Sequence, residues 1–168
     1  MCKKNNIIHI VIYILIVCFY TGCSKKNIEK SEKVYAISKL ISMNNTNVLG
    51  TVNFQQEDNT LAIVGMLKNL DPKKEYKIMF YEFGDISNKK GKSLGRVYQL
   101  PTFNGDNRFN KIQVNQTGHT IYKTNSSDYT LNNKNAIIGR SIVIYEVLKS
   151  KTKIVAAGVV GYKNGWHS

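Results

Sequence analysis

The sequence predicts an all-β protein made of short antiparallel strands, arranged as a sandwich or a barrel. From Val34 onward, apolar and polar residues alternate with a period of two, which is typical of strands with one buried face. These segments are evenly spaced and separated by polar turns, and no helical period of useful length follows residue 23. The 168 residues, 42% of them hydrophobic, suffice for one domain with its own core.

Eight segments carry this alternation. Glu-Asp-Asn at residues 57–59 marks the turn after the second segment, and Asn-Leu-Asp-Pro at 69–72 marks the turn before the fourth. Asn-Gly-Asp-Asn at 104–107 precedes the fifth, the sixth is the weakest, and the last two are the most regular. The expected strands cover residues 34–41, 48–55, 60–67, 76–83, 108–114, part of 119–131, 140–148 and 154–160.

Residues 1–22 are expected to be a lipoprotein signal peptide that does not belong to the fold. Lys3 and Lys4 form a positive start, and residues 7–20 are apolar except for His9. An apolar run of about 14 residues is too short to span ~30 Å of hydrocarbon comfortably. It fits the apolar region of a secretory signal, which forms a short helix.

The end of this segment, Tyr20-Thr21-Gly22-Cys23, resembles a bacterial lipobox. The resemblance implies cleavage before Cys23 and a diacylglyceryl group on its thiol, so the membrane is an expected partner. The alternative is an uncleaved anchor that ends in an incidental cysteine. Residues 23–33 are polar and lysine-rich, which is typical of a tether between a lipid and a domain.

The expected location is therefore the bacterial cell envelope. Ser24 after the cysteine resembles lipoproteins sorted to an outer membrane, so in a Gram-negative cell we expect the outer membrane or its periplasmic side. Cys2 and Cys18 lie in the signal, and Cys23 is expected to be acylated. The mature domain then has no thiol for a disulfide, and its stability must come from its core.

The net charge of +13 bears on partners. A basic surface favours acidic partners such as phospholipid headgroups, so an anionic envelope partner is one hypothesis. A plain solvated basic surface is the simpler interpretation. No basic run contains interleaved aromatic residues, so we expect no nucleic-acid partner.

Several short motifs occur in a suggestive order. The two longest are Tyr81-Glu82-Phe83-Gly84-Asp85 and Gly139-Arg140-Ser141-Ile142-Val143-Ile144-Tyr145-Glu146. The weaker ones are Gly50-Thr51-Val52-Asn53-Phe54, Leu70-Asp71-Pro72, Lys92-Ser93-Leu94-Gly95, Leu100-Pro101 and Ala157-Gly158-Val159-Val160-Gly161. From about Val34 to Gly161 this set resembles the copper/zinc superoxide dismutases, where the first block reads H-E-F-G-D and the Lys92 block reads K-S-A-G. The resemblance implies an eight-stranded antiparallel Greek-key β-barrel over residues 34–162, followed by a C-terminal tail, 163–168.

The same resemblance implies that the copper ligands are gone. In that family four histidines hold copper, and one of them also bridges to zinc. The resemblance places Met79, Tyr81 and Tyr145 at three of these positions and Val97 near the bridging one. Imidazole suits copper, whereas a neutral phenol with a pKa near 10 is a poor ligand at neutral pH.

The zinc side is expected to be lost as well. The loop that carries the zinc ligands in the family is shortened here, since Val97 and Gln99 stand for its two ends. The resemblance also places Ala157 at a disulfide cysteine and Ile154 at the arginine that attracts superoxide. The other histidines of the mature chain, His119 and His167, have no carboxylate or thiol at metal-binding spacing, so we expect no metal site from them.

These observations predict a superoxide dismutase-like envelope lipoprotein without catalytic or metal-binding residues, a pseudoenzyme with a binding or structural role. One alternative is residual or atypical copper-dependent superoxide dismutase activity, and another is a basic module that binds membrane surfaces. Tyr81 and Tyr145 are expected to fill the former metal site, either stacked or with buried rings, or else to line a small aromatic pocket. Gly84 is expected to allow an unusual backbone turn, and Asp85 to accept hydrogen bonds from nearby amides. The sequence contains no G-x-S-x-G motif, so a serine hydrolase is not supported.

Overall fold

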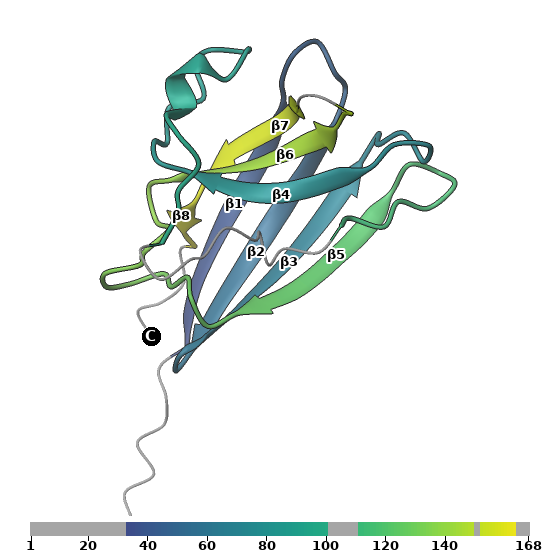
Figure 1. The fold of residues 1–168 in the computed structure, drawn as a ribbon. Coiled ribbons are helices and arrows are strands. Elements are labelled where there is room, and N and C mark those ends of the chain that lie inside the picture. Colours follow the sequence, from purple (N-terminus) through teal and green to yellow (C-terminus); the bar gives the residue numbers. More distant parts are fainter. Residues whose placement is uncertain (1–32, 101–110, 150–151, 164–168) are drawn as a thin grey trace, which may run out of the picture. The chain divides into compact units, whose positions relative to one another are not determined.

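A computed structural model describes residues 33–100, 111–149 and 152–163, all of which belong to the unit Ser31–Ser168 (Figure 1). Apart from one short 3-10 turn, every regular element in these ranges is a β-strand. The elements are β1 (Val34–Ser42), β2 (Leu49–Glu57), β3 (Thr60–Lys68), β4 (Tyr76–Tyr81), η1 (Lys92–Leu94), β5 (Thr120–Ser126), β6 (Ser141–Val147), β7 (Thr152–Val159) and β8 (Gly161–Tyr162). Six of the eight expected strands therefore form within two or three residues of their expected ends, and a seventh, β5, lies inside 119–131.

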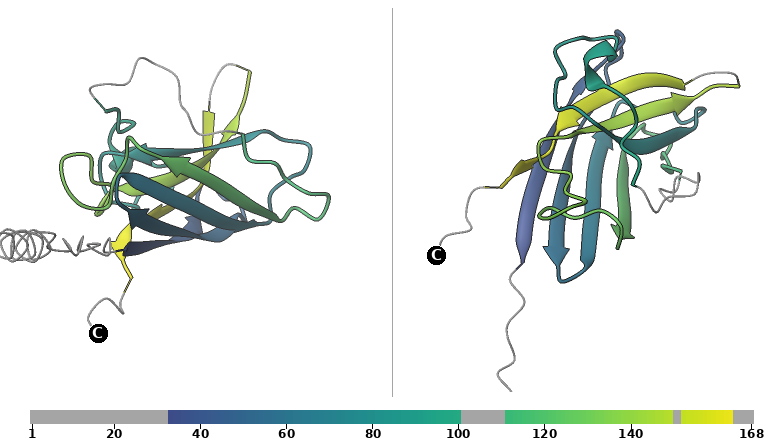
Figure 2. Two further views of the ribbon diagram at one scale, coloured as in Figure 1. Left: turned by 90° about the horizontal axis from the view of Figure 1, so that it is seen from below. Right: turned by 60° about the vertical axis from the view of Figure 1, so that its left-hand side comes forward.

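The strands form one antiparallel sheet in the order β4-β6-β7-β1-β2-β3-β5, and β8 pairs with β1. Between β3 and β6 the chain crosses three times from one end of this order to the other, which is a Greek-key type of connection. The pairing of β7 with β1 is limited to Ile41 and Ser42, so the sheet bends there. Figures 1 and 2 show the result, with β4, β6 and β7 lying across β1, β2, β3 and β5. The expected all-β antiparallel fold class is confirmed.

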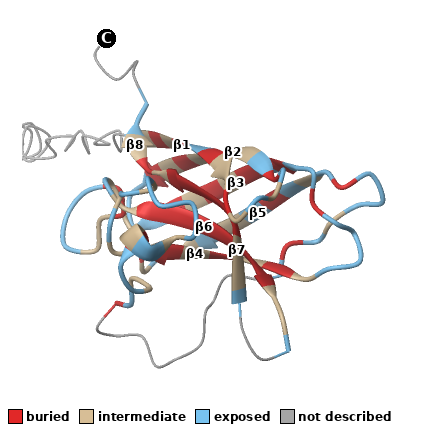
Figure 3. Cartoon of the chain, turned by 90° about the horizontal axis from the view of Figure 1, so that it is seen from above, coloured by how far each residue is buried: buried red, intermediate tan, exposed pale blue. Residues whose placement is uncertain are grey.

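The main core lies between these two parts of the sheet. Burial alternates along β2, β3 and β4, as the period of two predicts, whereas β6 is buried on both faces. Figure 3 marks buried positions on both parts of the sheet. Phe80 of β4 occupies the centre, with its ring 4.9 Å from that of Tyr129 and 6.3 Å from that of Phe54. Each such fully buried aromatic ring stabilises the fold by about 1.5–3 kcal/mol. The unit Ser31–Ser168 has its own hydrophobic core, so we expect it to fold without residues 1–30.

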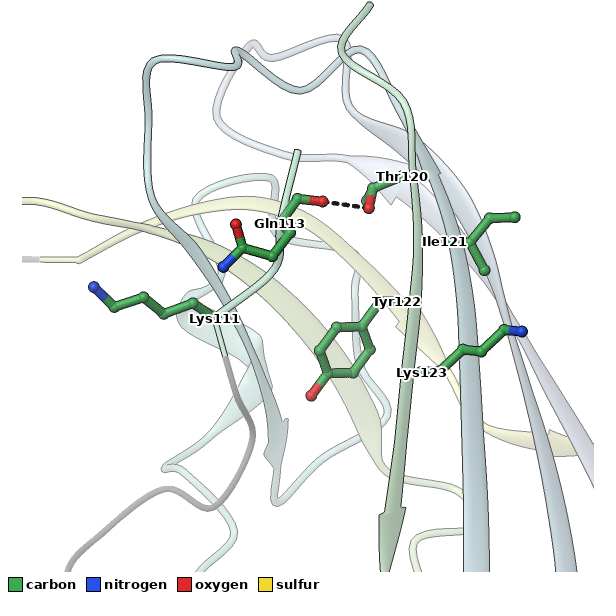
Figure 4. Close-up of a pocket in the computed structure, with 6 residues that line it drawn as sticks. All are labelled: Lys111, Gln113, Thr120, Ile121, Tyr122 and Lys123. Atoms are coloured by element: carbon green, nitrogen blue, oxygen red, sulfur yellow. Dashed lines mark hydrogen bonds between the residues drawn. The ribbon is translucent and has the colours of Figure 1, made fainter. Parts of the chain in front are cut away.

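The fifth expected strand, 108–114, does not form in its described part. Residues 108–110 lie outside the described ranges, and Ile112 makes only an isolated bridge to Tyr76, whose carbonyl accepts its N–H at 2.9 Å. Gln113 is held from the other side, where its carbonyl accepts a hydrogen bond from the Thr120 hydroxyl (Figure 4). Polar and apolar residues do alternate from Lys111 to Val114. Such alternation indicates a half-buried segment, but a strand also needs a neighbouring strand to pair with. In the described residues, β4 and β5 are consequently not joined by a ladder, and the eighth strand is β8.

The fourth expected strand also ends earlier than 83, at Tyr81. The N–H groups of Glu82 and Phe83 turn away to the carbonyls of Arg96 and Leu94, at 2.9 and 3.0 Å. The hydrogen bonds of this segment therefore go to residues 94–96 instead of continuing along β6. This change of partner holds residues 84–96, which we call the covering segment, over the site described next.

Candidate functional site

The candidate site is the outer face of β4, β6 and β7, on the side of this sheet opposite the main core. Register places Met79 opposite Val143, and Val143 opposite Ala157. In the neighbouring rows Tyr145 lies opposite Ile154, and Tyr81 lies opposite Ser141. Tyr81 also forms a bridge to Val97. The strand pairing thus brings the four expected counterparts of the copper histidines, Met79, Tyr81, Val97 and Tyr145, to this one region of the sheet.

A small apolar cluster fills the middle of this face. It consists of four residues that are each 0% exposed, which we call the apolar plug: Met43, Leu94, Val143 and Ala157. Tyr81, Ile86 and Ile154 pack against it. The covering segment lies very close, since a Cβ on Gly91 would be 2.6 Å from the Cδ1 atom of Ile154. The plug is therefore a second, smaller core on this face, built of apolar side chains that offer no nitrogen or oxygen ligand to a metal ion.

Leu94 is a member of the plug that the sequence analysis did not anticipate. It stands in η1, where the K-S-A-G motif of the resemblance has the smaller alanine. Its larger side chain extends into the space above Val143 and Ala157, residues that are themselves small or medium in size. The exchange of alanine for leucine in this motif was the available signal that the site is filled from the covering loop.

Tyr81 and Tyr145 behave differently from each other. Tyr81 packs against the apolar plug, and burial raises the pKa of its phenol. Because the phenolate is the form that binds metals, this shift makes Tyr81 an even poorer ligand near neutral pH. Tyr145 is 5% exposed and lies four residues along β6 from the partner of Tyr81, a separation of about 13 Å. Of the two expected arrangements, buried rings describe Tyr145 fully and Tyr81 in part, and the register keeps the two residues apart along β6.

The residues after Tyr81 have structural roles in the described part of the chain. Gly84 does not adopt a left-handed backbone, so the expectation of an unusual turn is wrong. It is needed for close approach instead, because a Cβ there would be 2.3 Å from the carbonyl oxygen of Gly139. Asp85 accepts the N–H of Ser87 at 2.9 Å, as expected. Hydrogen bonds from the side chain and backbone of Ser87 hold the pKa of Asp85 below its ordinary value.

Arg140 ties the two long motifs together. Its Nη1 donates to the carbonyl of Glu82 at 3.0 Å, and its Nε donates to the carbonyl of Ala136 at 3.0 Å. The guanidinium carbon also lies 3.5 Å above the ring centre of Tyr98. A shallow groove of about 670 Å³ opens beside these contacts, lined by Glu82, Phe83, Arg96, Val97, Tyr98, Gln99 and Arg140. These contacts make Arg140 a brace between the two motifs, and its side chain also forms part of the groove wall.

The donor set of the site does not fit copper or zinc. Within residues 33–100, 111–149 and 152–163, no three His, Cys, Asp or Glu side chains come together in a way that would hold a metal ion. His119 is exposed beside the turn at Gly118 and is not among the residues of the apolar plug. His167, Cys23, the signal residues 1–22, most of the tether and most of the tail lie outside the described residues. No helix in the described part of the chain is long and apolar enough to cross a membrane.

Comparison with known proteins supports the same ancestry. The family model for copper/zinc superoxide dismutase (SODC) matches residues 48–161, which is more than half of the chain. A search of curated proteins found no match. The match includes both long motifs, the covering segment and the apolar plug except for Met43.

Proposed function

The chain belongs to the copper/zinc superoxide dismutase family, and from this premise we propose that it is a catalytically inactive member with a binding or structural role in the bacterial cell envelope. The observation that carries the proposal is the apolar plug. A redox copper site needs nitrogen donors in a fixed geometry, and the four counterpart positions carry a thioether, two phenols and an isopropyl group. The metal-binding side chains are replaced, and apolar side chains occupy the space above the strands, since Leu94 and Val143 are fully buried there.

The proposal includes a lipid anchor. The lipobox-like ending at Cys23, after an apolar run too short to be a comfortable membrane span, supports acylation of its thiol. The anchored domain would then face the periplasm from the outer membrane of a Gram-negative cell, or the outside of a cell with one membrane. Mass spectrometry of the N-terminal peptide from membranes tests this part, with the Cys23→Ser variant as the control. A peptide that still begins at Met1 and carries no lipid would contradict it.

Metal content and dismutase activity test the loss of catalysis. The chain is loaded with copper and zinc salts, freed of loose ions, and analysed for both metals and for superoxide removal. An active family member treated identically shows that loading works. We expect neither metal to be retained and superoxide to decay at the buffer rate.

The rival function, an atypical copper enzyme, predicts the opposite result. Met79 is the one soft donor at a counterpart position, and a thioether favours copper(I). One tightly bound copper per chain together with fast superoxide removal would establish the rival. A second pair of variants locates any copper that is found, since Met79→Leu should release it and His119→Gln should not.

A further inference from the structure

The face of β1, β2, β3 and β5 that points away from the core carries an unusual set of side chains. Register aligns them in rows across the four strands, of which the central one is Lys39, Thr51, Met66 and Ile121. The next row contains Ile37, Asn53, Val64 and Lys123, and the row on the other side contains Leu49 and Lys68. We call these ten residues the outer face. Figure 4 shows the alternation directly, with Ile121 and Lys123 on one side of β5 and Tyr122 on the other.

Large apolar side chains protrude from the outer face. Leu49 and Met66 are each 47% exposed and Ile121 is 65% exposed, although all three lie on paired strands. Met66 lies directly opposite Ile121, and Leu49 is the diagonal neighbour of Met66. Contiguous exposed apolar side chains with a polar surround are typical of an interaction surface.

The charge on the outer face has one sign. Its three charged residues are Lys39, Lys68 and Lys123, and its rows contain no Asp or Glu. Among the described residues, none of these three lysines takes part in an ion pair. The nearest strand-end acid, Glu57, is 3.1 Å from the ammonium group of Lys33. The protein itself does not neutralise these three lysines, so the outer face attracts anions.

This charge decides between possible occupants. A second copy of the chain would place two faces whose charged residues are all lysines against each other in a two-fold contact, which like charges oppose. A small ligand would need a pocket among the protruding side chains. The depression next to Gln55 and Val64 is only about 280 Å³, and the one of about 640 Å³ beside Ile121 and Lys123 lies at the β5 edge and is not lined by Leu49 or Met66. A bilayer with anionic lipids satisfies both features, because aliphatic side chains enter the headgroup region while lysines reach the phosphates.

We propose that the outer face docks on an anionic lipid surface, with Leu49, Met66 and Ile121 inserted and the three lysines paired with lipid phosphates. This deepens the proposed envelope role by naming the surface and the partner, and it requires neither inactivity nor acylation. If Cys23 is acylated, the tether to Lys33 reaches at most about 35 Å, which keeps the domain close to the lipid. The anchor then raises the effective concentration of the face at the bilayer.

The test uses residues 31–168, whose folded state is checked by near-ultraviolet circular dichroism. Co-sedimentation is measured with vesicles of phosphatidylcholine alone and of phosphatidylcholine mixed with phosphatidylglycerol. We expect binding to the mixed vesicles that weakens as salt increases, since screening reduces the attraction. Each lysine near an anionic surface strengthens binding about five-fold, so changing all three to glutamine should weaken it about 100-fold.

Matched variants separate the outer face from general basicity. A control triple removes the same charge from exposed positions elsewhere, namely Lys90→Gln, Lys92→Gln and Lys134→Gln. We expect it to weaken binding less than ten-fold, and an equal loss in both triples would overturn the proposal. Met66→Ser with Ile121→Ser should weaken binding while leaving its salt dependence unchanged.

Two further outcomes would also overturn the proposal that the outer face docks on anionic lipid. One is absence of vesicle binding by the folded domain at low salt, which leaves an acidic protein as the partner of this face. The other is a dimer in sedimentation equilibrium that Met66→Asp dissociates, which would make the face a self-association surface. Neither outcome affects the metal and dismutase measurements, so failure here is distinguishable from failure of the proposed loss of catalysis.

Discussion

Replacing Leu94 by alanine tests whether the former metal site is a packed part of the fold. Leu94 is 0% exposed and contacts the other members of the apolar plug, so its truncation removes buried methyl groups and leaves a cavity. Leu→Ala changes in cores cost about 2–5 kcal/mol, depending on how far the surroundings collapse. Here one wall is the surface segment around η1, which can settle into the gap. We therefore expect the lower part of the range, about 2–3 kcal/mol.

Urea unfolding followed by circular dichroism measures this loss. With a typical slope, the midpoint should fall by about 1–1.5 M, and the melting temperature by roughly 10 °C. Lys92→Ala is the matched control, because Lys92 lies two residues earlier in the same turn and is exposed. It should stay within about 0.5 kcal/mol of the parent chain. A Leu94→Ala variant that is equally close to the parent would show that the plug is not packed, and the filled-site argument would fail.

Two other predictions concern the loop contact and the buried phenols. Gly84→Ala should destabilise the fold by about 1–3 kcal/mol, because the added Cβ would lie 2.3 Å from the Gly139 carbonyl oxygen. A Cβ at Gly161 would have no atom within 4 Å, so Gly161→Ala should be near neutral. Equal unfolding midpoints of the two variants in urea would refute the steric argument. Burial raises the pKa of Tyr129 from 10.0 to about 12, so the folded state prefers the neutral phenol, which donates to the Tyr98 carbonyl at 3.1 Å. The resulting stability is complete below about pH 10 and is lost as the pH rises toward about 12. When the pH is raised from 8 to 11, the free energy of unfolding of Tyr129→Phe should therefore fall less than that of the parent chain, as measured by urea titration. An equal fall in both proteins would contradict the raised pKa of Tyr129.

The strands were predictable because a period of two is a local property. Burial alternates over all of Thr60 to Lys68 and over the middle of Val34 to Ser42, and both segments form strands with nearly the expected ends. The same local signal misled at Lys111 to Val114, where alternation is present and a ladder is not. The end of β4 was also misplaced, since the apolar Phe83 continues the pattern but its N–H bonds to Leu94. A ladder needs a second segment in register, and a single segment does not encode that partner.

The candidate site was predictable in part. Order of motifs was enough to find Met79, Tyr81, Val97 and Tyr145, and strand pairing brings them to one region of the sheet. The distance between the two tyrosines was not predictable, because it follows from the pairing of β4 with β6 and not from either motif. The role of Gly84 was misread for a similar reason, since the atom that it must avoid belongs to Gly139, far along the chain.

The amino-acid sequence alone determined which side chains alternate along each strand and which metal donors are missing, because both are read one residue at a time. Only the tertiary structure decided that Met43, Leu94, Val143 and Ala157 pack into the space above β6 and β7. It alone also decided that lysines from β1, β3 and β5 share one face with Leu49, Met66 and Ile121. Sheet neighbours lie far apart in the chain, and their register results from the packing of the whole core, so no local pattern encodes these surfaces.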